Sequence, residues 1–132
     1  MLGLDWETLR LFLHVLGATV WVGGQLLLGA LVPVLRRIDA TAPKAVARAF
    51  ARVGWPAFVL LVGTGIWNIV AVGHQDADYR HTLDAKLVFV ALSGIGAFAH
   101  QRATSKAMLA AGGAVGLIGA LLALLYGVRL AQ

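Results

Sequence analysis

One stretch near the N-terminus, residues 9–24, contains the residues best suited to chemistry. It reads LRLFLHVLGATVWVGG, and its mostly apolar run contains one histidine, His14. Gly17 and Ala18 follow one turn later and Trp21 two turns later, so a helix would present all four on one face. An ionisable side chain inside an apolar helix is costly unless it has a partner or a function. His14 is therefore the first candidate site residue.

Two interpretations of His14 follow from its chemistry. A neutral imidazole is a good axial ligand for haem iron. Gly17 and Ala18 would leave room for the flat macrocycle, and Trp21 would form a wall of the pocket. Alternatively, His14 is hydrogen-bonded across helices to Asn68 or to a backbone carbonyl, as intramembrane polar groups often are. The residues alone leave both interpretations open.

Copper is a second candidate metal. Cu(I) prefers thiolate and thioether ligands, but the chain has no cysteine and only two methionines, Met1 and Met108. His74 and His81, in a predicted outer loop, would bind Cu(II) only weakly. The sequence also has no phosphate-binding loop, no nucleophile–base pair and no dinucleotide fingerprint. The ligand inventory therefore favours haem over copper.

The elements that position these residues are predicted to be membrane-spanning helices. The chain has 132 residues, of which 60% are hydrophobic and 13% charged, and its mean hydropathy is +0.83. A soluble domain of this size could not bury so much apolar surface. We therefore expect one all-α domain over residues 1–132, a four-helix transmembrane bundle with a short basic interfacial helix at 43–52. The expected spans are 9–35, 53–72, 83–99 and 107–128.

The charged residues indicate the orientation of the spans. Seven basic residues and one acid lie on one side, and four basic residues and five acids lie on the other. Basic loops favour the cytoplasm, so both termini are predicted to be outside in a multi-pass protein of the cell membrane. The net charge of +5 then reflects contact with lipid headgroups, and no nucleic-acid partner is needed to explain it.

With this topology, four spans each place a polar side chain near the outer surface. These are His14, Asn68, Lys86 and Tyr126, with Arg129 one turn beyond the last of them. Lys86 and Arg129 are suited to pairing with haem propionates. Lys86 is alternatively a second axial ligand, if burial lowers its pKa enough. We expect this outer level to form a cofactor-binding pocket.

A second histidine, His100, lies near the cytoplasmic end of the third span. It is about 15 Å deeper than His14 along the membrane normal, too far for both to ligate one iron. Lys86, Ser93 and His100 are spaced by seven residues, so they should line one inward-facing stripe. Such a stripe is also suited to a proton path.

The fourth span contains a stripe of small residues, and the third connection is only a few residues long. The short connection predicts that spans three and four are antiparallel neighbours. Small residues let membrane helices approach closely, so we expect the stripe to pack against another helix, with homodimerisation as the alternative. Its members are Gly112, Gly116, Gly119 and Ala123.

Three segments resemble the copper-resistance D (CopD)-like membrane domain. They are FLHVLGATVWVGG, followed by PVLRR; GTGIWN in the second span; and YRHTLDAKLVFVALSGIGAFAHQR around the third. The chain is also similar to the HemJ-type protoporphyrinogen oxidases, small haem-associated membrane proteins of four to five helices. That resemblance implies that the first-helix histidine and third-helix lysine are functional, here His14 and Lys86.

These observations lead to a ranked set of hypotheses. The first is a haem b-binding membrane protein of CopD-like type in electron transfer or in haem or metal handling. The others are copper transport, as a homo-oligomer or with a metal-donor partner; HemJ-like oxidation of protoporphyrinogen IX; and a structural subunit of a larger complex. The sequence does not decide whether the protein is an enzyme or an oxidoreductase.

Overall fold

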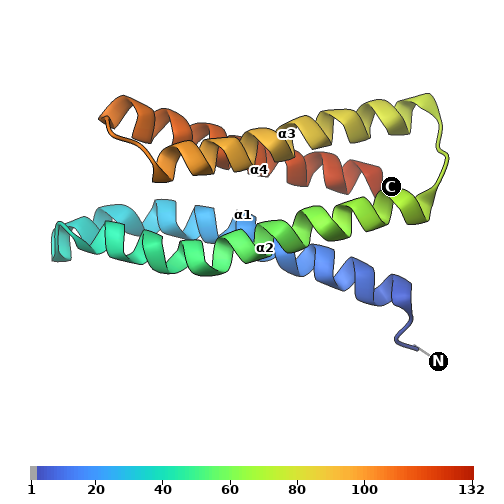
Figure 1. Ribbon diagram of the computed structural model, residues 1–132, viewed down its shortest axis with the longest axis horizontal. Coiled ribbons are helices and arrows are strands. Elements are labelled where there is room, and N and C mark those ends of the chain that lie inside the picture. The colour runs from blue at the N-terminus through green and yellow to red at the C-terminus, as the bar shows by residue number, and fades with distance from the viewer. Residues whose placement is uncertain (1–2) are drawn as a thin grey trace. The chain divides into compact units, whose positions relative to one another are not determined.

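The computed structural model describes residues 3–132, and this part of the chain is helical with no strands (Figure 1). Its helices are α1 (Trp6–Ile38), α2 (Ala42–Val72), α3 (Ala77–Gln101) and α4 (Lys106–Leu130). All four are long and apolar enough to cross a membrane. The predicted all-α class with four membrane-spanning helices is confirmed.

The basic segment at 43–52 is not a separate helix. It forms the first turns of α2, which continues without a break to Val72. At 1.5 Å per residue, the 31 residues of α2 extend about 46 Å, well beyond the ~30 Å hydrocarbon core. The basic first turns of α2 are therefore long enough to reach the headgroup region while remaining part of the spanning helix.

Short polar caps define the helix ends. Asp5 Oδ1 accepts a hydrogen bond from Thr8 N at 2.7 Å, and Asp76 and Ser105 cap α3 and α4 in the same way. The Thr8 amide lowers the pKa of Asp5, and the Thr41 amide lowers that of Asp39 in the α1–α2 link. α2 ends at Gly73, whose φ of +74° is readily adopted only by glycine. These caps satisfy backbone amides that the helices leave unpaired.

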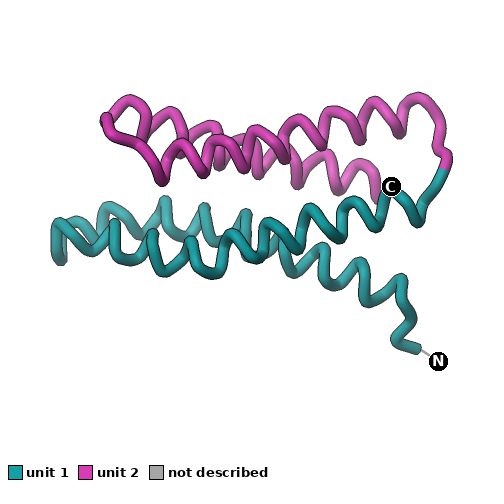
Figure 2. The backbone as a smooth tube through the Cα atoms, in the orientation of Figure 1, with its two compact units in different colours: residues 1–73 teal, residues 74–132 magenta. Residues whose placement is uncertain are grey.

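The chain forms two compact units, residues 1–73 and residues 74–132 (Figure 2). The first unit is the hairpin of α1 and α2, and the second is the hairpin of α3 and α4. The predicted antiparallel pairing of the third and fourth spans is thus confirmed. Each unit is described by itself below.

Small residues bring α3 and α4 into close contact. Gly112, Gly116, Gly119 and Ala123 are all buried. A Cβ atom added to Gly116 would lie 3.0 Å from the backbone nitrogen of Ala97 in α3. The small-residue stripe therefore packs against a neighbouring helix of its own hairpin, which was the first expectation for it. A homodimer would have to use another surface.

Candidate functional site

His14 is held by a side chain of the neighbouring helix. Its Nδ1 lies 2.9 Å from Oγ1 of Thr64 in α2, and Thr64 is only 5% exposed. The Thr64 hydroxyl also lies 2.7 Å from the carbonyl oxygen of Leu60 and 3.2 Å from that of Leu61. When the hydroxyl donates its one hydrogen to Leu60, its oxygen accepts from Nδ1–H of His14, and the lone pair of the ring is then on Nε2.

The sequence interpretation did not identify Thr64. It named Asn68 or a backbone carbonyl as the partner across the helices, whereas Asn68 lies one turn further along α2. Asn68 Oδ1 makes no hydrogen bond within the described part of the chain. Thr64 lies between Gly63 and Gly65 in the GTG segment, and Gly65 lies beside the His14 ring. A Cβ atom on Gly65 would lie 3.4 Å from Cε1 of His14. The position of its hydroxyl between two glycines was the sequence signal that could have identified Thr64.

Gly17 and Trp21 lie on the same face of α1 as His14, as predicted, but this face packs against α2. A Cβ atom on Gly17 would lie 3.0 Å from the Ala57 carbonyl oxygen. Trp21 is 2% exposed, and its ring centroid lies 5.2 Å from that of Trp55 and 4.5 Å from that of Phe58. In this unit, the space beside Gly17 is filled by the backbone of α2, so both residues serve helix packing.

The second unit brings together three other predicted site residues at the start of α3 and the end of α4. Lys86 is partly buried, and its Nζ would lie 3.2 Å from a Cβ atom on Gly127. Tyr126 packs on Phe89 with ring centroids 5.3 Å apart. Arg129 follows one turn later. Lys86, Tyr126 and Arg129 therefore lie towards the same end of this hairpin.

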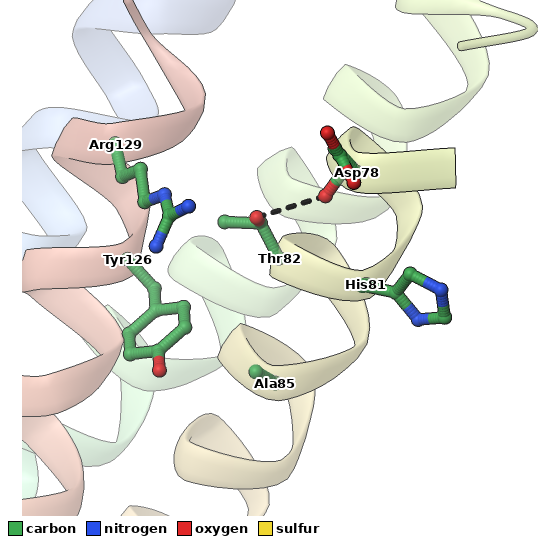
Figure 3. A pocket seen from close by; sticks show the side chains of 6 residues that line it. All are labelled: Asp78, His81, Thr82, Ala85, Tyr126 and Arg129. Atoms are coloured by element: carbon green, nitrogen blue, oxygen red, sulfur yellow. Dashed lines mark hydrogen bonds between the residues drawn. The ribbon is translucent and has the colours of Figure 1, made fainter. Parts of the chain in front are cut away.

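Next to these residues is an open cavity of about 340 Å³. In Figure 3, Arg129 and Tyr126 project from α4 towards α3, while the His81 ring points away from them. The Thr82 hydroxyl on the α3 side donates to the Asp78 carbonyl oxygen at 2.9 Å. The lining thus offers one cation, one acid and a phenol. Its residues are Asp78, His81, Thr82, Ala85, Tyr126 and Arg129.

His100 has a structural position in the same hairpin. Its Nδ1 lies 2.7 Å from the carbonyl oxygen of Leu109 in α4. Since a carbonyl only accepts, Nδ1 of His100 carries the proton. Lys86 and His100 contact α4 and Ser93 between them is buried, so all three lie on the side of α3 that contacts α4. His100 therefore ties the two helices at the end of the hairpin away from Lys86.

The candidate cofactor-binding residues belong to both units. His14 and Asn68 belong to the first unit, whereas Lys86, Tyr126 and Arg129 belong to the second. Within residues 3–132, no three side chains among His, Cys, Asp and Glu gather closely enough to hold a metal ion. Met1 lies outside the described residues, and Met108 is 39% exposed at the start of α4. His81, expected in a loop, lies in the first turns of α3.

Comparison with known proteins gives no match. No family model, no curated protein and no solved structure matches the chain.

Proposed function

We propose that this chain is a haem b-binding protein of CopD-like type in the cell membrane, with His14 as axial ligand. The observation that carries the proposal is the hydrogen bond of 2.9 Å between Nδ1 of His14 and the hydroxyl of Thr64. Histidines that ligate metals usually donate their other ring N–H to a fixed acceptor, which sets the tautomer and raises the basicity of the ligating nitrogen. An imidazole anchored through Nδ1 presents Nε2 as the donor to iron.

The residues present fit a haem better than a bare metal ion. A porphyrin brings four nitrogen donors of its own, so iron needs only one or two ligands from the protein. His14 supplies one soft nitrogen donor in an apolar span. The HemJ-type resemblance implies that Lys86 is functional as well. Bound haem supplies one-electron chemistry at its iron, which suits a role in electron transfer or haem handling.

The visible spectrum of the full-length protein, purified in detergent without added cofactor, tests this proposal. We expect a Soret band and stoichiometric haem. A colourless protein that retains stoichiometric copper would instead support the copper-transport alternative and overturn the proposal. Haem together with turnover of protoporphyrinogen IX would place the protein among the enzymes.

The anchor of His14 gives a graded prediction. Thr64→Val keeps the shape of the side chain but removes the acceptor for Nδ1–H, so we expect haem affinity to fall about 10–100-fold, as for other metal sites that lose such a partner. Thr64→Ser keeps the hydroxyl and should bind nearly as well as the unmodified protein. Haemin titration of the apoprotein, followed at the Soret band, measures both. Equal affinity of the valine and serine variants would show that Thr64 does not support the ligand.

A further inference from the structure

Two polar atoms of the first unit are buried without a hydrogen-bond partner in the described part of the chain. They are Nε of Arg10 in α1 and Oδ1 of Asn68 in α2. Leaving a buried polar atom unpaired typically costs about 1–3 kcal/mol, and more when the group is charged. One such atom on each helix of the hairpin suggests that a bound ligand supplies the missing hydrogen bonds of both.

The helix register places these two residues at the same level. Arg10 lies one turn before His14 in α1, and Asn68 lies one turn after Thr64 in α2. The helices are antiparallel and His14 is bonded to Thr64. Arg10 and Asn68 are therefore both displaced by about one turn, roughly 6 Å, from that bond in the same direction. In Figure 1, the N-terminal turns of α1 also run away from α2.

The charge of Arg10 is not balanced within the described residues. Guanidinium stays protonated under all ordinary conditions. The acids nearest in sequence are Asp5, which caps α1 through Thr8, and Glu7, which is exposed. Neither forms an ion pair with Arg10. A guanidinium is the best side-chain match for a carboxylate, because its fork donates two parallel hydrogen bonds.

We propose that Arg10 and Asn68 bind a carboxylate of the ligand held at His14, which for haem is a propionate. This inference rests on the proposed function, since it requires a ligand at His14. Asn68 contributes because a half-turn of its amide presents the NH₂ group instead of the oxygen. The carboxylate would accept hydrogen bonds from both Arg10 and Asn68. It differs from the expectation based on Lys86 and Arg129, which belong to the other unit.

The test compares haemin with haem dimethyl ester, in which both propionates are neutral. Full-length apoprotein in phosphatidylcholine nanodiscs is titrated with each, so that no anionic lipid competes for Arg10. The variants are Arg10→Gln, Asn68→Leu and, as the matched control, Arg36→Gln, which removes an exposed arginine in the last turn of the same helix. We expect the unmodified protein and Arg36→Gln to prefer haemin by about tenfold or more, and Arg10→Gln to bind haemin and the ester equally. Asn68→Leu should reduce the preference by a smaller factor.

Each other outcome is decisive. Retention of the preference in Arg10→Gln, or its equal loss in Arg36→Gln, overturns the carboxylate site while leaving His14 as ligand. Equal loss of both ligands in Arg10→Gln, with an unchanged circular dichroism spectrum, also overturns it, since Arg10 would then not recognise the carboxylate. Failure of the unmodified protein to bind either ligand disproves the proposed function, and this inference with it.

Discussion

Replacing His14 by alanine is expected to abolish the Soret band of the purified protein. His14 is the proposed axial ligand, and its orientation depends on the 2.9 Å hydrogen bond to Thr64. Loss of a hydrogen-bonded partner alone weakens metal sites about 10–100-fold, so loss of the ligand itself should weaken haem binding by more than about 100-fold. Haemin titration of the apoprotein measures the affinity, and the pyridine haemochrome spectrum measures the haem retained on purification.

The matched control is His100→Ala. His100 donates from Nδ1 to the Leu109 carbonyl oxygen and is predicted to lie too deep to share an iron with His14. Its loss should leave the Soret band unchanged and destabilise the α3–α4 hairpin by about 1 kcal/mol, the usual value of one hydrogen bond. A band that survives His14→Ala but is lost in His100→Ala would move the ligand to the second unit. A band that survives both substitutions would exclude histidine ligation at either position.

The fold was predictable because a bilayer permits few solutions. Backbone groups in lipid must be satisfied within the protein, so apolar runs of this length become helices. Within the second unit, the stripe of small residues that includes Gly112 and Gly116 correctly predicted the face of α4 that contacts α3. The separation of the basic segment at 43–52 from the second span was not correct. Gly54 and Pro56 lie at this junction, but the helix continues through both, so the basic segment and the spanning part form one α2.

The site was less predictable, because composition cannot distinguish a helix neighbour from a ligand. Gly17 and Trp21 were correctly placed on the face of His14, but small and aromatic residues suit α2 as well as they suit a macrocycle. Thr64 was missed because its role depends on the register of α1 against α2. That register is set by packing such as the contact of Gly17 with the α2 backbone. A periodic pattern within one helix does not contain this information.

The close approach of α3 and α4 makes Gly96 the position with the largest expected effect on stability. A Cβ atom there would lie 2.8 Å from Cα of Gly116 and 2.9 Å from the carbonyl oxygen of Gly112. These are backbone atoms, so no change of rotamer can relieve the overlap, and the helices must move apart. Separation would also disturb the contacts of Ser93 and His100 with α4, because both lie on the same stripe.

Overpacking usually costs about 1–3 kcal/mol. We therefore expect Gly96→Ala to lower the free energy of unfolding by about 3 kcal/mol or more. Gly127→Ala is the matched control, because its Cβ atom would meet only the flexible Lys86 side chain, with Nζ at 3.2 Å. That amine can move, and alanine is favoured over glycine in a helix by about 0.5–1 kcal/mol, so the control should be neutral or stabilised.

Sodium dodecyl sulfate titrations followed by circular dichroism give the two free energies of unfolding, and amide hydrogen exchange locates the loss of stability in α3 and α4. Equal stability of the two variants would contradict the glycine-mediated contact and open the small-residue face of α4 to another partner.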